Sequence, residues 1–351
     1  MQEIHTTALT EKDPLEPGLL QPYLDQFAPA LGKILEIRRY TGGYSNLTYF
    51  VQTAEKAYVL RMPPVGAQIK SAHDMSREYK VLGMLKPHFS KIPTPLLFCG
   101  SADVLGTPFY MMEKLDGTIL RAARAPEMNI PAAVFRKLSI SFTDNLVALH
   151  ALDIETTGLI GLGKPEGYTK RQVEGWVSRY FSAETDTLPD INAVAKWLQE
   201  KQPLPQPPAF LHNDYKYDNL LLNPDNLTEI TGVLDWEMST VGDPLMDLGA
   251  ALAYWFEADE PAVFRQYNLS WLPGNFTRQE LIDRYATQSG RDLRDILFYY
   301  VFGLFKNAVI AQQIYHRWKQ GYSSDARFGA LLPMIQLLGR KAAETIQKNS
   351  V

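Results

Sequence analysis

The sequence predicts an α+β fold in which a small antiparallel sheet comes first and helices follow. Five strand-like runs, separated by turn residues, lie within the first 112 residues. From residue 131 onward, apolar residues recur at helical spacing instead. Strands followed by helices are typical of the α+β class. A length of 351 residues suits one large domain or two lobes.

The N-terminal part is expected to be a sheet with two helices. Residues up to about 16 should form a loose arm, and apolar spacing over 18–31 predicts a short helix. A second helix is expected over 71–85, between the third and fourth strands. The predicted strands span 34–40, 47–53, 57–62, 96–101 and 107–112.

The C-terminal part is expected to be mostly helical. Pro131 is the predicted first residue of its helix, because proline suits the first helical turn. Asp243 before Pro244 resembles a helix N-cap, and Thr277 with Glu280 forms a capping box. The predicted helices span 131–150, 169–180, 192–198, 244–256, 277–289, 292–319 and 331–348.

Composition excludes several classes of function. The net charge of -4 and the lack of a long basic run argue against nucleic-acid binding. No apolar run is long enough to span a bilayer, and residues 1–13 lack the apolar stretch of a signal peptide. The single cysteine, Cys99, rules out an intrachain disulfide. We therefore expect a cytoplasmic protein without a membrane partner, and the sequence carries no signal of its oligomeric state.

Three oxygen-bearing side chains between residues 212 and 235 predict the chemistry. Asp214 lies in a turn after an apolar run, and its carboxylate can orient a hydroxyl and accept its proton. Asn219 follows five positions later, and Asp235 ends another apolar run. Amide and carboxylate oxygens are ligands that Mg²⁺ prefers alongside substrate phosphates. Taken singly, each of these residues could equally be a turn or helix cap.

The order of these residues is the order used in kinase-type phosphoryl transfer: His-x-Asp, then Asn, then Asp after a short hairpin. The segment 212–247 resembles the aminoglycoside phosphotransferase and choline kinase-like family. It is most similar to the branch of kinase-like domains fused to acyl-CoA dehydrogenases. The resemblance implies a bilobal protein-kinase-like fold, with an N-terminal lobe over 1–115 and a C-terminal lobe over 116–351. ATP or GTP with Mg²⁺ would bind between them, with Asp214 as the catalytic base and Asn219 and Asp235 as metal ligands.

A loop with two adjacent glycines resembles the phosphate-covering loop of this family. Gly42 and Gly43 permit a tight turn and close approach of backbone amides to an anion. Ser45 and Asn46 lie near the tip of the same loop. A plain hairpin loop is the alternative interpretation.

Arg61 closes the third predicted strand, where kinases usually place a lysine that holds the phosphates. Arginine can bridge two phosphate oxygens, so we expect a substitution and not a loss of activity. Glu78, on the following helix, could pair with Arg61 as in kinases. The resemblance places Met112, Glu113 and Leu115 at the purine, in the link between the lobes.

The acceptor is expected to be a small molecule with a hydroxyl group. Between Asp235 and Asp243 the chain has no room for the long activation segment of protein kinases. The candidate residues at the acceptor site are mostly basic, which favours an anionic acceptor such as a hydroxyacyl-CoA. A cationic aminoglycoside would need an acidic pocket. The candidate acceptor residues are Arg171, Trp176, Lys306 and Arg317. Each of them also has a structural interpretation as a packed or solvated side chain.

Other interpretations remain at this level. Arg61 in place of lysine is compatible with a nucleotide-binding scaffold that has no turnover. A metal-dependent hydrolase could use the same acids, although the histidines are too scattered to form a cluster. His212 and Asp247 are expected to brace the catalytic turn and not to react themselves.

Overall fold

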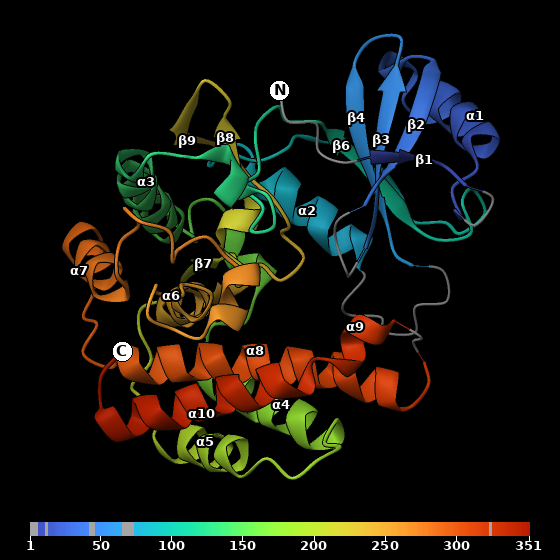
Figure 1. Cartoon of the computed structure of the whole chain (residues 1–351). Coiled ribbons are helices and arrows are strands. Elements are labelled where there is room, and N and C mark those ends of the chain that lie inside the picture. The colour runs from blue at the N-terminus through green and yellow to red at the C-terminus, as the bar shows by residue number, and fades with distance from the viewer. Residues whose placement is uncertain (1–5, 11–12, 42–45, 65–73, 323–324) are drawn as a thin grey trace. The chain divides into compact units, whose positions relative to one another are not determined.

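The computed structural model describes residues 6–10, 13–41, 46–64, 74–322 and 325–351 (Figure 1). The chain forms two compact units. The first comprises Met1–Ile119 and Asn219–Met238, and the second comprises Leu120–Asp218 and Ser239–Val351. The stretch 219–238 therefore packs with the N-terminal residues, which a single boundary at residue 115 does not anticipate. The assignment of separate functions to 1–115 and 116–351 stays a prediction.

The first unit contains an antiparallel sheet with strand order β1-β2-β3-β4-β6-β5. Its strands are β1 (Thr6–Ala8), β2 (Ile34–Tyr40), β3 (Leu47–Thr53), β4 (Ala57–Met62), β5 (Pro95–Cys99) and β6 (Phe109–Glu113). The bounds of β2, β3 and β4 match the predicted ones. The prediction of a loose N-terminal arm was wrong for residues 6–8, because Thr6 to Ala8 pair with Tyr40 to Arg38 at the sheet edge.

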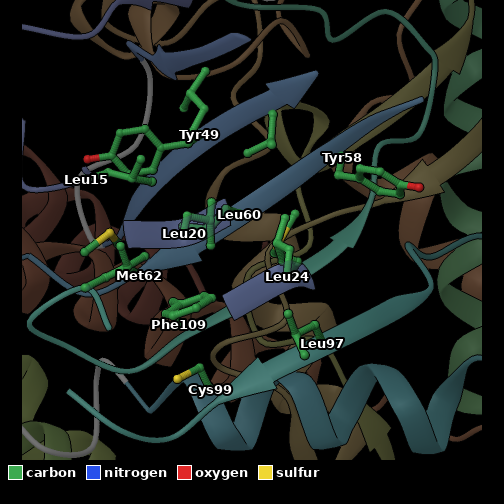
Figure 2. Packing of buried hydrophobic residues seen from close by; sticks show 14 of the residues in the cluster. Leu15, Leu20, Leu24, Tyr49, Tyr58, Leu60, Met62, Leu97, Cys99 and Phe109 are labelled. Atoms are coloured by element: carbon green, nitrogen blue, oxygen red, sulfur yellow. The ribbon is translucent and has the colours of Figure 1, made fainter. Parts of the chain in front are cut away.

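One face of this sheet packs in an apolar core, and the other face carries Arg61. Helix α1 (Pro17–Phe27), followed by the short η1 (Pro29–Leu31), covers one face. There Leu20 and Leu24 pack with Leu60 and Met62 of β4 in an apolar core (Figure 2). Side chains alternate along a strand, so Arg61, between Leu60 and Met62, points to the opposite face. That face carries α2 (Met75–Leu85).

A hairpin completes the first unit. Strands β8 (Leu220–Asn223) and β9 (Asn226–Val233) pair antiparallel, with Leu220 opposite Val233. Just outside the strands, the N–H of Leu234 donates to the carbonyl of Asn219 at 2.8 Å. The pairing therefore brings Asn219 and the segment that carries Asp235 to the same end of the hairpin.

The second unit is mostly helical. The helix α8 lies alongside α6 and α10 (Figure 1). A Cβ added at Gly303 of α8 would lie 2.3 Å from the carbonyl oxygen of Gly249 in α6, so these glycines allow the close crossing. The helices are α3 (Ala132–His150), α4 (Tyr168–Ser182), α5 (Pro189–Glu200), α6 (Pro244–Ala253), α7 (Arg278–Ser289), α8 (Ile296–Lys319), α9 (Ala326–Gly329) and α10 (Leu332–Lys348).

Helix ends show where the sequence signals were accurate. The capping box of Thr277 and Glu280 is present at the start of α7, and Asp243 caps α6. Pro131 is the N-cap of α3 and not its first helical residue, and α8 begins at Ile296, four residues later than predicted. Within the described ranges, no helix is both long and apolar enough to cross a bilayer.

Candidate active site

The turn that carries Asp214 is held rigidly within the second unit. It follows β7 (Ala209–Leu211), which pairs with β10 (Thr240–Gly242). Asn213 adopts a left-handed backbone conformation with φ of 65°. Outside glycine such a conformation is uncommon, and it persists only where surrounding contacts enforce it.

Asp247 supplies these contacts from the first turn of α6. Its fully buried carboxylate accepts the N–H of His212 at 2.6 Å and the N–H of Asn213 at 2.8 Å. It also lies 3.1 Å from Nε2 of His150. Burial alone would raise the pKa of Asp247, but these hydrogen bonds and the nearby imidazoles hold it below its ordinary value. The expectation that Asp247 braces the turn is confirmed.

Hydrogen bonds orient Asp214, but its carboxylate is still partly exposed to solvent. Its backbone N–H donates to Nδ1 of His212 at 3.2 Å, so His212 acts as the expected brace. Lys216 Nζ donates to both carboxylate oxygens, at 3.0 and 2.8 Å, and lies 4.7 Å from the ring centroid of Tyr254. The Asp214 side chain keeps 16% of its surface exposed, which leaves room for a hydroxyl to approach. Lys216 is a site residue that the sequence pattern did not indicate.

Lys306 contacts the same turn. Its buried Nζ donates to the carbonyl of Asn213 at 2.7 Å and lies 5.7 Å from the ring centroid of Trp176. Burial lowers the pKa of Lys306, and the Asp214 carboxylate acts against that shift. Lys306 thus stabilises the carbonyl side of the turn, whereas Asp247 stabilises its amide side.

Replacing Asp247 with Asn should lower the free energy of unfolding by about 3–5 kcal/mol, because the buried network loses its negative charge and one of its two acceptor oxygens, which an NH2 donor replaces. The folded-state pKa is depressed, so this stabilisation is present above the ordinary pKa of 3.8 and is lost as pH falls through the lower folded value. Urea titrations of wild type and Asp247→Asn at pH 7 and near pH 3 would measure both effects. The exposed Asp259→Asn is the control. An Asp247→Asn cost below about 1 kcal/mol at pH 7 would contradict the assigned role.

In the first unit, Arg61 is the buried centre of an ionic cluster, in which Glu78 is buried and the carboxylates of Asp235 and Glu237 are partly exposed. One of its terminal nitrogens pairs with Glu78 of α2, and the other lies 3.1 Å from Asp235 Oδ1 and 3.6 Å from Glu237 Oε2. Burial acts to lower the pKa of Arg61, but the carboxylates, Glu78 foremost, raise it well above its usual value. The predicted contact between Arg61 and Glu78 is confirmed. Its role in holding a nucleotide stays a prediction.

Asp235 and Asn219 carry side-chain oxygens of the kind that Mg²⁺ prefers, and their role as metal ligands stays a prediction. Asp235 has a left-handed φ of 68°, which turns its carboxylate into the Arg61 cluster. Asn219 lies at the same end of the hairpin and is 8% exposed. No cluster of three or more His, Cys, Asp or Glu that could hold a metal occurs in the part of the chain that the structure describes. Mg²⁺ fits this sparse set, since it commonly uses one or two carboxylates and completes its shell with phosphates and water.

Glu237 is the residue that sequence reasoning missed here. Its Oε2 accepts from Nδ2 of buried Asn46 at 2.7 Å, which ties the end of the glycine loop to the Asp235 segment. The only sequence signal for Glu237 is its position two residues after Asp235.

The remaining residues predicted to bind the nucleotide are either outside the described residues or packed within the first unit. Gly42, Gly43 and Ser45 lie outside the described residues. The Glu113 carboxylate accepts the N–H and hydroxyl of Thr94, at 3.2 and 2.7 Å. Met112 is buried in β6, and Leu115 lies beside Gly232 of β9.

The four predicted acceptor residues do not form one cluster. Trp176 and Lys306 lie together, as described above. Arg171 donates to the backbone carbonyls of Lys164 and Glu166, and so fastens the loop before α4. Arg317 lines a pocket on another part of α8.

The model of the phosphotransferase enzyme family matches residues 36–282, which include every residue of the Arg61 cluster and of the Asp214 turn. The chain belongs to this family. Curated members similar to it include acyl-CoA dehydrogenase family member 11 of Gallus gallus, 32% identical over 98% of this chain and 45% of that protein. Family member 10 of Mus musculus is 33% identical over 83% of this chain and 27% of that protein. The chain thus spans less than half the length of these relatives.

Solved structures confirm the protein-kinase-like α+β fold of this family member. A protein of Ralstonia eutropha, provisionally assigned as an aminoglycoside phosphotransferase, superposes with a TM-score of 0.79 at 27% identity, covering 95% of this chain and 98% of that one. A choline kinase of Cryptosporidium parvum gives a TM-score of 0.58 at 13% identity, covering 92% and 98%. The second likeness concerns the fold alone.

Proposed function

We propose that this phosphotransferase family member moves the γ-phosphoryl group of ATP or GTP to a hydroxyl of a small molecule, with Mg²⁺. The observation that carries the proposal is the Arg61 cluster, in which one guanidinium joins Glu78 on a helix to Asp235 after the hairpin. A buried cation fixed by one carboxylate and adjacent to a second is the arrangement that phosphate and metal binding require.

On the nucleotide side, Arg61 would bind phosphate oxygens while Glu78 holds its guanidinium in place. Asn219 and Asp235 would supply oxygen ligands to the metal. A bound Mg²⁺ neutralises charge on the phosphates during transfer. Asp235 now accepts a hydrogen bond from Arg61, so nucleotide binding would exchange that contact for phosphate and metal contacts.

On the acceptor side, Asp214 would orient the hydroxyl and accept its proton. Phosphoryl transfer has a loose transition state, so positioning contributes more than base strength. The support for this role is the rigid turn, in which Asp247, Lys306 and His212 fix the backbone while the Asp214 carboxylate remains partly exposed. Lys216 would hold the carboxylate in place through its two hydrogen bonds.

A hydroxyacyl-CoA or a similar hydroxylated anion is the acceptor we favour. The support is the similarity to proteins named acyl-CoA dehydrogenase family members, together with Arg179 of α4 and Arg317 of α8, which line one pocket. The second candidate is an aminoglycoside, which the Ralstonia neighbour favours.

Screening hydroxyacyl-CoAs against aminoglycosides, with ATP or GTP and Mg²⁺, tests the proposal. We expect nucleotide consumption that depends on a hydroxyacyl-CoA and stops when the metal is chelated. Stimulation by an aminoglycoside alone would favour the second candidate. Nucleotide binding without consumption under any condition would favour a non-catalytic scaffold.

A further inference from the structure

A surface pocket lies between the C-terminal parts of α4 and α8, within the second unit. Its volume is about 240 Å³. Six polar or cationic residues line it: Ser178, Arg179, Ser182, Gln313, His316 and Arg317. The lining contains no carboxylate, so its charge comes from two guanidinium groups.

The described structure gives these two arginines no carboxylate partner. No ion pair of Arg179 or Arg317 occurs among the described residues. Asp186, near the same helix ends, is held by Lys319 at 3.0 Å. The Nδ1 atom of His316 is buried and has no partner in the described structure. An anion with several acceptor oxygens would pair with both guanidinium groups together.

The frame around the pocket is preformed. The Arg179 guanidinium stacks 4.9 Å from the ring centroid of Trp176, which limits its freedom. Gln312 Nε2 donates to the carbonyl of Ala183 at 2.8 Å and joins the two helices beside the pocket. Because the Arg179 guanidinium is held before a ligand arrives, binding would cost less conformational entropy at that side chain.

We propose that this pocket binds a phosphate group, and that the phosphate belongs to the acceptor. Two guanidinium groups, two hydroxyls and an amide match the many oxygens of a phosphate better than a single carboxylate. The first part stands on the pocket alone, whereas the second rests on the proposed function.

The position of the pocket suits a long acceptor. Lys306, which holds the Asp214 turn, and Arg317 lie on the same helix, eleven residues apart. At about 1.5 Å per residue this is roughly 16 Å along α8. An acceptor with its hydroxyl at one end and its phosphate at the other, joined by an extended arm, fits this separation.

Calorimetric titration with inorganic phosphate tests the pocket directly. Arg179→Ala and Arg317→Ala should each weaken phosphate binding about tenfold, and the double variant more, because each removes a charge-assisted contact. The matched control is Arg294→Ala, an exposed arginine just before α8 and 22 to 23 residues from the pocket residues His316 and Arg317. Phosphate affinity that is unchanged in the double variant would overturn the proposal, whether or not the chain shows turnover.

Kinetics then test the link to the acceptor. In the double variant, KM for a hydroxyacyl-CoA should rise at least tenfold, while KM for the hydroxyacyl-pantetheine, which lacks the nucleotide phosphates, and KM for ATP stay unchanged. If the double variant loses phosphate binding but the wild type shows no turnover on any acceptor, the proposed function is contradicted and the phosphate site is still supported. An equal rise in KM for both acceptors would overturn the assignment of the phosphate to the acceptor.

Discussion

Asp214→Asn is expected to reduce kcat for nucleotide-dependent phosphorylation by about 10² to 10⁴-fold, the usual contribution of a positioned general base. Asn keeps the size of the side chain and can still contact the hydroxyl, but it cannot take a proton. Because Asp214 is proposed to act on the acceptor and not on the nucleotide, the Kd for ATP should change little. Steady-state kinetics with a responsive acceptor and calorimetric titration with ATP would measure both quantities.

The variant also removes the partner of Lys216, so a loss of folding has to be excluded. The exposed Asp259 lies in the same unit, and Asp259→Asn should leave kcat and thermal stability unchanged. If Asp214→Asn has the melting temperature of the wild type and its kcat stays within about threefold of the wild-type value, Asp214 is not the base.

Asp235→Ala is expected to abolish most of the metal-dependent activity, by about 10² to 10³-fold, because the ion supplies several kcal/mol of charge stabilisation. The variant should also lose the Mg²⁺-dependent gain in ATP affinity, while metal-free ATP binding persists through Arg61. Glu78 and Glu237 still neutralise that guanidinium, so the fold should survive. A titration of ATP at several Mg²⁺ concentrations would measure the coupling between metal and nucleotide.

Two further variants sharpen this result. Asp235→Asn keeps an oxygen ligand without its charge, so its metal dependence should fall between wild type and Asp235→Ala. Asp225→Asn, an exposed position in the turn of the same hairpin, should behave as wild type. Equal Mg²⁺ dependence in wild type and Asp235→Ala would mean that the metal is held elsewhere.

The strands were predictable where local pattern determines them. The bounds of β2, β3 and β4 follow from apolar runs bounded by turn residues, and they match the predictions. Strand β1 escaped prediction, because its three residues are largely exposed and only pairing with β2 makes them a strand. The start of α8 was placed too early, because Asp292, Arg294 and Asp295 are as compatible with a turn as with a helix.

The site shows the same division. Polar residues at strand ends and the resemblance together indicated Asp214, Asn219 and Asp235. Glu237 and Lys216 were missed, because a single charged residue in a sequence is usually a solvated surface group, even when it lies two positions from a site residue. Their roles arise from contacts of Glu237 with Asn46 and of Lys216 with Asp214, and the first of these joins residues far apart in the sequence.

A crystal structure with Mg²⁺ and a non-hydrolysable ATP analogue tests the central claim most directly. The account predicts one or two ions whose shell includes the Asn219 side-chain oxygen and an Asp235 carboxylate oxygen at about 2.0–2.1 Å, with Arg61 released from Asp235 onto a phosphate oxygen. A nucleotide bound without these contacts, while Arg61 stays on Asp235, would contradict it.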